Sequence, residues 1–291
     1  MSEELWTSTL TGYRRRGTRL REMRALFGAT VTAEAILEPL QACRADAHAQ
    51  SSKAELRTRD FDVAGVRERR DGPLLGMVTR EDLGEGSTRA YVKEIATRQV
   101  VSEATPLGEL FAALAESEYV LVMVHRSISG IIARADLNKP PVRVYLFGLV
   151  SLLEMHLSYW VRTIYPREAW RPHLSAPRIN KAEALLAERA ARNEATHILA
   201  CLQFCDKREI LISSVAWRRD CGLGGKSQAE KWLKNVEELR NTLAHSQPSI
   251  AGRAGWGPVI QLVQSIENIL ERSDALLEQR AVEGAVIGPM L

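Results

Sequence analysis

The sequence predicts an α+β protein, with an N-terminal half of short strands and helices followed by an all-helical bundle. Two observations support this prediction. One strand–turn–strand pattern occurs twice before residue 140, and beyond it apolar residues recur at helical spacing in long segments. A chain of 291 residues is long enough for two domains. We therefore expect a basic helical segment over residues 1–29, a repeat domain over 30–140 and a helical bundle over 141–291.

The N-terminal segment is marked by its arginines. A run at residues 14–16 is followed by Arg19, Arg21 and Arg24. This spacing is typical of a basic helix or arm. Charge runs of this kind are usually solvated surfaces, and contact with RNA or another anion is the alternative.

The repeat domain contains two similar β-hairpins. Its strands are expected at residues 61–66, 74–79, 119–124 and 128–132. In each copy the second strand carries Gly, two apolar residues, three further residues and then Asp-Leu, at 76–83 and again at 130–137. Before the second hairpin, Thr105 and Pro106 form an N-cap signal for a helix over 107–116. Each unit therefore reads as a small β-α-β-β-α repeat.

This paired motif resembles the CBS domain, a regulatory module that joins two such repeats. The resemblance covers about residues 30–140. In that family the Thr or Ser and the Asp of the motif contact the phosphate and ribose of an adenine nucleotide or a related ligand. The resemblance therefore implies Thr79, Asp82 and Asp136 as ligand-binding residues, with an adenine-nucleotide-type regulatory ligand. Ala133 replaces the hydroxyl residue of the second copy, and the alternative is a pair used only for dimerisation.

Capping signals and prolines divide the C-terminal half into five amphipathic helices. The helices are expected at residues 142–165, 181–204, 206–219, 228–244 and 259–280. Asn180, Asp206 and Ser227 are the expected capping residues. Pro166 ends the first helix, and Pro258 lies in the first turn of the last. Amphipathic helices joined by short connections indicate a bundle.

Two patterns in this half imitate ligand sites. Residues 222–227 are similar to a phosphate-binding loop, but the first required glycine is missing and Ser227 is better explained as a helix cap. His197, Cys201 and Cys205 are spaced along one face of an expected helix. The outer two would lie roughly 12 Å apart, too far for one metal ion. We expect small core residues there and no metal site.

The segment Arg240-Asn-Thr-Leu-Ala-His245 closes the fourth expected helix. Arg192 and His197 have the same spacing, but they fall in the middle of an expected helix, whereas a glycine-containing loop follows His245. On a helix Asn241 and His245 share a face, while Arg240 is about 140° away from His245. A helix end, a loop or a second subunit is needed to bring all three to one phosphate.

This segment resembles the HEPN superfamily, all-helical domains whose active members carry Arg, a polar residue, three further residues and His at this place. The resemblance covers about residues 142–285, and Asn241 is the polar type found in ribonucleolytic members. It implies a homodimer that places two motifs across one cleft. It also implies metal-independent RNA cleavage with Arg240, Asn241 and His245 as catalytic residues and no cofactor for catalysis.

These residue types suit cleavage beside a 2′-hydroxyl group. Imidazole accepts and donates protons near neutral pH, as required of the base and acid in this reaction. A guanidinium provides a fixed cation against the negative charge that builds on the phosphorane.

Arg240 and two polar residues of the first bundle helix also have ordinary structural explanations. Arg240 can pair with Glu237 or Glu238, and Glu154 and His156 in the first bundle helix can line a cleft, although solvation is the favoured explanation.

Composition limits the range of functions. The net charge of +3 excludes a broad polyanion-binding protein, and it lies in the second half, where 19 basic residues face 16 acidic ones. The acidic start has no apolar core, and the most apolar stretch, residues 144–153, is about half of what a membrane span needs. Four cysteines without a paired framework fit a reducing compartment. We expect a cytoplasmic protein without a membrane partner.

Taken together, these patterns predict a ligand-regulated, metal-independent endoribonuclease. A tandem CBS sensor over residues 30–140 would control a HEPN-like bundle over 141–291, as in a toxin or antiphage-defence effector that acts on RNA. The alternative is a non-catalytic, nucleotide-sensing regulatory protein whose helical domain binds RNA or a partner protein.

Overall fold

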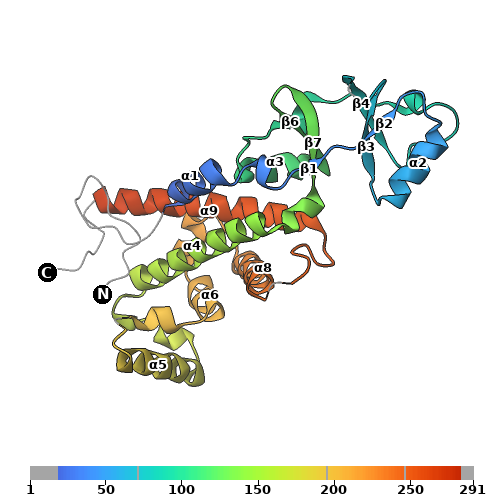
Figure 1. The fold of residues 1–291 in the computed structure, drawn as a ribbon. Coiled ribbons are helices and arrows are strands. Elements are labelled where there is room, and N and C mark those ends of the chain that lie inside the picture. Colours follow the sequence, from blue (N-terminus) through green and yellow to red (C-terminus); the bar gives the residue numbers. More distant parts are fainter. Residues whose placement is uncertain (1–18, 71, 195, 246, 283–291) are drawn as a thin grey trace. The chain divides into compact units, whose positions relative to one another are not determined.

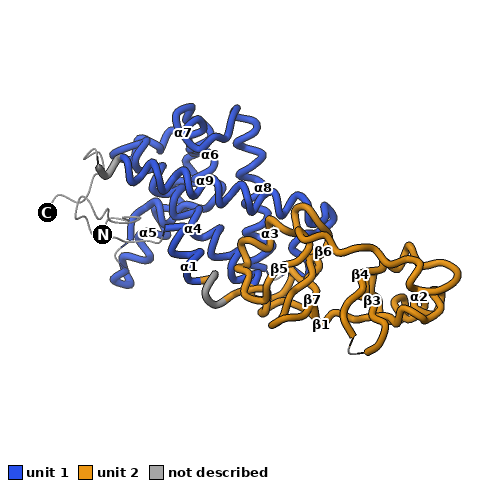
Figure 2. The backbone as a smooth tube through the Cα atoms, turned by 90° about the horizontal axis from the view of Figure 1, so that it is seen from above, with its two compact units in different colours: residues 1–26, 142–291 blue, residues 27–141 orange. Residues whose placement is uncertain are grey.

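A computed structural model describes residues 19–70, 72–194, 196–245 and 247–282. The chain divides into two compact units, coloured separately in Figure 2. Phe27–Pro141 forms the sheet unit, and Val142–Leu291 with Met1–Leu26 forms the helical unit. The division falls beside residue 140, and the described residues of the N-terminal segment are shared between the two units.

The sheet unit contains two β-α-β-β repeats, which confirms the α+β class. The first repeat consists of β2 (Ala42–Arg44), α2 (Ala49–Thr58), β3 (Val63–Arg67) and β4 (Leu74–Thr79). The second consists of β5 (Val100–Ser102), α3 (Leu107–Glu116), β6 (Tyr119–Val124) and β7 (Ser127–Ala133). The helical element that closes each repeat is a short 3₁₀ helix, η2 (Thr88–Tyr91) in the first and η4 (Arg134–Asn138) in the second. Two further 3₁₀ helices are η1 (Ala33–Ala35) and η3 (Thr97–Gln99).

Both repeats pair their strands in the same way. β2 runs parallel to β3, which is antiparallel to β4, and β5, β6 and β7 repeat this order. A short strand before the first repeat, β1 (Glu38–Pro39), pairs with β7 and gives the second sheet four strands. Gly130 of β7 pairs with Pro39 of β1. A Cβ atom at Gly130 would lie only 3.0 Å from Val122 and 3.3 Å from Leu37, so a residue without a side chain fits there.

The core of the first repeat is built from small and branched residues of the strands and α2. Its fully buried members include Leu56, Val66, Val78 and Leu83. Leu83 follows Asp82 directly, so burial of this leucine fixes the position of the acidic residue at the surface. The equivalent Leu137 is also fully buried. In both motifs, therefore, the leucine after the aspartate is part of the core.

The helical unit is all-helical, as the sequence predicts. Its helices are α1 (Leu20–Thr30, of which the first seven residues belong here), α4 (Pro140–Ile164), α5 (Ala176–Ala191), α6 (Phe204–Ile212), α7 (Val215–Asp220), α8 (Lys226–Ala244) and α9 (Trp256–Val282). Its 3₁₀ helices are η5 (Pro166–Glu168), η6 (Arg171–His173) and η7 (Ile198–Cys201). α4 and α9 run side by side in the same direction (Figure 1), joined by bonds from Tyr145 to Glu267 and from Trp160 to Ser273.

Several expected boundaries are wrong. The helix expected over 181–204 begins five residues earlier and ends at Ala191. The helix expected over 206–219 is split into α6 and α7. Ser227 does not cap α8. Gly225 does, and its backbone N–H donates to the side chain of Gln228 at 3.1 Å.

α4 is longer than the apolar stretch that the sequence singles out. It is 25 residues long, and its most apolar window has a mean hydropathy of 1.3, which is enough in length and composition to cross a membrane. Of that window, 67% is buried inside the fold. The core helix of a soluble protein passes the same test, so this single helix is weak evidence for a membrane span.

The described arginines of the N-terminal segment are mainly structural. Arg19 pairs with Glu278 at 2.9 Å, and Arg24 pairs with Glu267 at 2.9 Å. Both partners lie on α9, so these two guanidiniums hold α1 against that helix. Arg21 is exposed, and residues 14–16 lie outside the described residues.

Glu154 is half-buried and His156 is buried, so solvation does not explain His156. The Glu154 carboxylate pairs with Lys207, at 3.0 Å, and Lys207 is buried. His156 is 1% exposed, and its Nδ1 lies 2.7 Å from the hydroxyl of Ser273, which also accepts a bond from Trp160. Because burial disfavours the charged imidazolium, the pKa of His156 falls from its usual value of 6.5 to about 3.

This burial predicts acid sensitivity of the helical unit. A histidine whose folded pKa is depressed stabilises the fold fully above the unfolded pKa and loses that contribution as pH falls toward the folded pKa. Between pH 6.5 and pH 5, the protein should lose about 2 kcal/mol of unfolding free energy relative to His156→Gln, which does not titrate there. Denaturant unfolding followed by tryptophan fluorescence measures this, because all six tryptophans lie outside residues 27–141.

The matched control is His48→Gln, a change at an exposed histidine of the sheet unit. It shows how far replacing an exposed histidine by glutamine alters the pH profile. If the pH profiles of His156→Gln and the parent run parallel, His156 is not held neutral by burial.

Candidate functional site

The first candidate site is the end of β4, where the Gly-Met-Val-Thr motif meets Asp82. Thr79 closes the strand, and its hydroxyl donates to Oδ2 of Asp82. The Nζ of Lys93 lies 2.5 Å from the same oxygen. Oδ1 of Asp82 contacts neither Thr79 nor Lys93. The structure therefore brings together Thr79 and Asp82, as the sequence predicts. It also places Lys93 beside them, which the sequence does not predict.

Lys93 reaches Asp82 because its backbone approaches β4 closely. Met77 and Lys93 exchange two backbone hydrogen bonds, of 3.0 and 2.8 Å. A side chain at Gly76 would collide with the carbonyl of Lys93 and with Val92. The glycine of the motif is thus required by this approach, and any larger residue would push Lys93 away from Asp82.

The electrostatics of this site favour an ionised carboxylate. The bond with Lys93, followed by that with Thr79, lowers the pKa of Asp82 below its ordinary value. The Nζ of Lys53 donates to the carbonyl of Leu83 at 2.8 Å and adds positive charge nearby. At neutral pH Asp82 is therefore an acceptor only, which suits it to hydroxyl donors.

The equivalent residue of the second repeat is used differently. Oδ2 of Asp136 accepts from the backbone N–H of Ala133 at 2.8 Å, and Oδ1 lies 3.0 Å from Nζ of Lys139. Lys139 also donates to the carbonyl of Ile36 at 2.6 Å and pairs with Glu38. Both oxygens of Asp136 therefore hold the fold together, and the missing hydroxyl at Ala133 is replaced by a backbone contact.

The second candidate site is the C-terminal end of α8. Arg240, Asn241 and His245 are all exposed there, and Nη1 of Arg240 donates to the amide oxygen of Asn241 at 3.3 Å. The backbone N–H of His245 caps the helix by donating to the carbonyl of Asn241 at 3.0 Å. The Arg240 side chain therefore contacts Asn241, which shares a helix face with His245.

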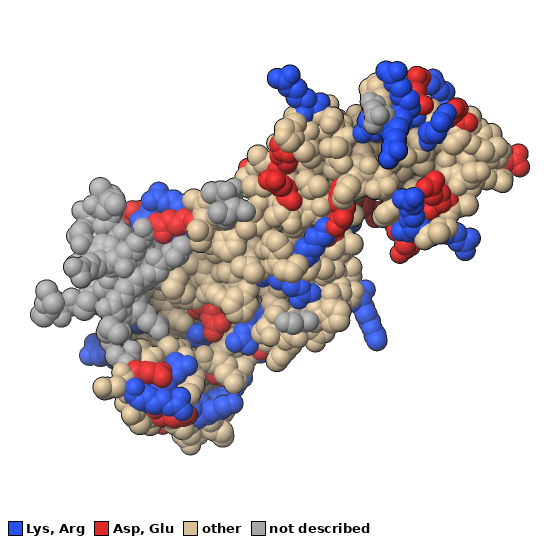
Figure 3. All heavy atoms as spheres, in the orientation of Figure 1, with Lys and Arg blue, Asp and Glu red and all other residues tan. Residues whose placement is uncertain are grey.

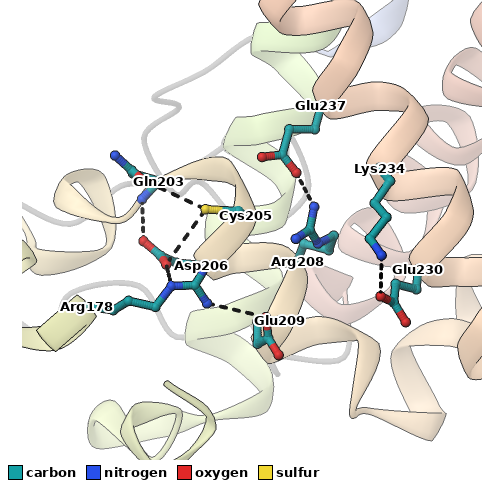
Figure 4. A network of polar contacts seen from close by, with 9 residues as sticks. All are labelled: Arg178, Gln203, Cys205, Asp206, Arg208, Glu209, Glu230, Lys234 and Glu237. Carbon is teal, nitrogen blue, oxygen red and sulfur yellow. Dashed lines mark hydrogen bonds and ion pairs between the residues drawn. The ribbon is translucent and has the colours of Figure 1, made fainter. Parts of the chain in front are cut away.

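Glu237, one turn before this motif, is occupied elsewhere. It pairs with Arg208 of α6, as Figure 4 shows. On the same helix Glu230 pairs with Lys234 at 2.7 Å, and the indole of Trp232 donates to Ser265 of α9 at 2.7 Å. Among the described residues, no carboxylate pairs with Arg240. The explanation of Arg240 as a partner of Glu237 or Glu238 therefore finds no support.

A further arginine lies beside the motif and was not predicted. Arg143, in the first turn of α4, donates to the carbonyl of Gln247 and, at 3.3 Å, to that of Pro248. Both carbonyls belong to the loop that follows His245. A tertiary contact of this kind leaves no signal in the sequence, because Arg143 is far from the loop along the chain.

The competing Arg192–His197 pair is not in the middle of a helix, contrary to expectation. α5 ends at Ala191, and Nδ1 of His197 accepts from the backbone of Leu199 at 3.2 Å to cap η7. Arg192 pairs with Glu188 at 2.6 Å. Arg192 and His197 are therefore both engaged in local contacts.

The cysteines do not share a helix face with His197 either. Cys201 is buried in η7, and Cys205 lies at the start of α6. The Sγ of Cys205 faces Gln203 and Asp206, as Figure 4 shows. Among the described residues, no group of three or more His, Cys, Asp or Glu side chains is arranged to hold a metal ion.

Comparison with known proteins gives fold similarity for part of the chain. No protein-family model and no curated protein matches it. Solved structures of CBS domains align with about two fifths of the chain. One, a CBS domain-containing protein of unknown function from Bacillus anthracis, is 10% identical, covers 39% of this chain and 93% of its own, and has a TM-score of 0.33.

Some of the similar structures contain nucleotides or nucleosides. A CBS domain pair in complex with 5′-methylthioadenosine and S-adenosyl-L-methionine is 14% identical, covers 37% of this chain and 96% of its own, and has a TM-score of 0.32. The CBS domain of a bacterial CNNM/CorC family Mg²⁺ transporter in complex with ATP is 16% identical, covers 42% of this chain and 95% of its own, and has a TM-score of 0.34. These ligands are those of the neighbours.

Proposed function

We propose that this chain is a ligand-regulated, metal-independent endoribonuclease. In this proposal the helical unit cleaves RNA at Arg240, Asn241 and His245, and the sheet unit senses an adenine-nucleotide-type ligand at Thr79 and Asp82. The observation that carries the proposal is the exposed Arg240, which no described carboxylate pairs with, beside Asn241 on the helix that His245 caps. The free cysteines fit the cytoplasm as the place of this activity.

The proposed reaction uses the neighbouring 2′-hydroxyl as nucleophile. His245 accepts its proton as O2′ attacks phosphorus, and the bond to the 5′ oxygen breaks. The products are a 2′,3′-cyclic phosphate and a 5′-hydroxyl, whose proton comes from an imidazolium or from water. Arg240 stabilises the added negative charge on the phosphorane, and Asn241 orients its guanidinium. A guanidinium tied to a carboxylate would be less available, so the pairing of Glu237 with Arg208 supports this role.

In the sensor, Asp82 has one carboxylate oxygen that contacts neither Thr79 nor Lys93. A ribose hydroxyl can donate to this oxygen without displacing Lys93, while the ammonium group stays available to a phosphate. Asp136 offers no such oxygen, because both of its oxygens are engaged. We therefore assign ligand binding to the first repeat, and the second site, Asp136, to structure.

A homodimer is part of the proposal because one chain presents a single motif. Val144 and Phe147 are apolar residues of α4 that are 60% and 50% exposed. They lie within the first two turns of α4, next to Arg143, which contacts the loop after His245. An exposed apolar pair close to the motif supports a two-fold interface that brings two motifs together.

The catalytic assignment is tested by RNA cleavage in the presence of EDTA. Arg240→Ala and His245→Ala should each lower the cleavage rate by at least about a hundredfold, because each removes a charge or a proton carrier from the transition state. Arg192→Ala and His48→Ala are the matched controls, at exposed residues outside the motif, and should cleave like the parent.

Cleavage by both motif variants at the parent rate would contradict the assignment. RNA that is bound but left intact by the parent protein, with and without adenine nucleotides, would favour the alternative, a non-catalytic nucleotide sensor whose helical unit binds RNA or a partner protein.

The dimer is tested separately with Phe147→Glu. Burying an unpaired carboxylate in an apolar interface costs several kcal/mol, so this variant should sediment as a monomer and lose cleavage activity. Phe61→Glu, at an exposed phenylalanine of the sheet unit, is the control and should remain dimeric and active. A parent protein that sediments as a monomer while cleaving RNA would contradict the interface.

A further inference from the structure

The loop after α8 begins at the histidine to which the proposed function assigns proton transfer. His245 caps the helix, and it is exposed there. Beyond it, the backbone N–H of Gln247 donates to the carbonyl of Thr242 at 3.2 Å. The end of α8 therefore holds the loop directly as far as Gln247.

Arg143 of α4 holds the other side of Gln247. Its Nη2 donates to the carbonyl of Gln247 and, at 3.3 Å, to that of Pro248. One guanidinium thus fixes two consecutive peptide groups. Because a proline restricts the backbone of the residue before it, Pro248 further limits the conformations that Gln247 can adopt.

The rest of the loop is anchored further along the chain. Ile250 and Ala251 are buried. A Cβ atom added at Gly252 or Gly255 would meet no described atom within 4 Å, so the loop is open there. The Arg143 contact lies between the helix end and the buried pair, and it holds the part of the loop nearest His245.

The backbone that carries Arg143 is firmly packed. Val142 and Tyr145 on either side of it are fully buried, and the hydroxyl of Tyr145 donates to Glu267 of α9. The Arg143 side chain itself is half-buried. The loop is therefore tied to a core helix of the helical unit.

α4 offers Arg143 no acidic partner one turn away. The positions three and four residues before and after it hold Lys139, Pro140, Leu146 and Phe147. Along α4, the face of the helical unit that Figure 3 shows is mainly uncharged, and residues 144–153 contain no charged side chain. An ion pair within the helix therefore does not compete with the loop carbonyls for this guanidinium.

We propose that Arg143 is a positioning residue for the RNA cleavage proposed above, on which this inference rests. Arg143 fixes the loop on the C-terminal side of His245, and the end of α8 fixes the N-terminal side. Proton transfer requires the imidazole to lie about 2.6–3.2 Å from the 2′-hydroxyl oxygen. A displacement of about 1 Å can lower a rate about a hundredfold, so the loop contact matters for the chemical step.

This role affects the chemical step more than the binding of RNA. Arg240, which meets the phosphorane in the proposed reaction, bonds to Asn241 within α8. Loss of the Arg143 contact should therefore lower kcat and leave KM nearly unchanged. Loss of a residue that only binds RNA would instead raise KM at constant kcat.

The test compares Arg143→Ala and Arg143→Met with the parent in steady-state RNA cleavage with EDTA. Methionine keeps an apolar stem but cannot donate, so Arg143→Met should preserve the packing of α4. Both variants should lower kcat by about ten- to a hundredfold and change KM by less than about twofold. The matched control is Arg162→Met, at a half-buried arginine near the end of α4 that contacts the ring of Tyr159, and it should cleave like the parent.

Hydrogen exchange measures the loop itself, without RNA. In Arg143→Met the backbone amide of Gln247 should exchange at least about fivefold faster than in the parent, because the loop leaves the carbonyl of Thr242 more often. In Arg162→Met it should exchange at the parent rate.

The two measurements separate this inference from the proposed function. A parent protein that does not cleave RNA contradicts the proposed function and removes this inference with it. If the parent cleaves RNA and both Arg143 variants keep its kcat, or lose activity only through a raised KM, the inference about Arg143 alone is wrong. Unchanged exchange at Gln247 in Arg143→Met would overturn it as well, because the loop would then not depend on this contact.

Discussion

In the proposed function, the end of α8 depends on the ion pair between Arg208 and Glu237. A carboxylate one turn before Arg240 would ordinarily neutralise that arginine, and the guanidinium would then be a surface contact of little chemical use. Glu237 is instead paired with Arg208 of α6, and Arg240 donates to the neutral amide oxygen of Asn241, so that Glu237 does not offset its positive charge. The same pair ties α8 to α6 and fixes the helix whose last residues form the motif.

The same criterion, whether a charged group is already paired, separates structural from functional groups in the sheet unit. Asp136 has both oxygens engaged, whereas Thr79 and Lys93 both contact the same oxygen of Asp82, and the proposal assigns the other oxygen to a ligand. In the proposal RNA binds the helical unit, which has 25 basic and 19 acidic residues, whereas the sheet unit has a net charge of −3.

Local signals predicted much of the fold, and tertiary contacts limited the rest. β6 and α3 lie at their predicted residues, because turn and cap signals flank them directly. The end of α5 was missed because it depends on Asn193, which adopts a left-handed conformation (φ 62°) without a glycine or proline nearby. Thr79 and Asp82 were recognisable from their motif. The Lys93 beside them was not, because it arrives through the close backbone approach that Gly76 permits.

The central claim is that a ligand held by the sheet unit controls chemistry in the helical unit. The most direct measurement is the rate of RNA cleavage by the full chain in EDTA, with and without saturating ATP, for the parent protein and for Asp82→Ala. Coupling between such sites typically changes a response by about fivefold or more. ATP should therefore shift the parent rate by at least about fivefold and leave the rate of Asp82→Ala unchanged. A parent rate that ATP does not alter, or an Asp82→Ala protein that responds as the parent does, would contradict the claim.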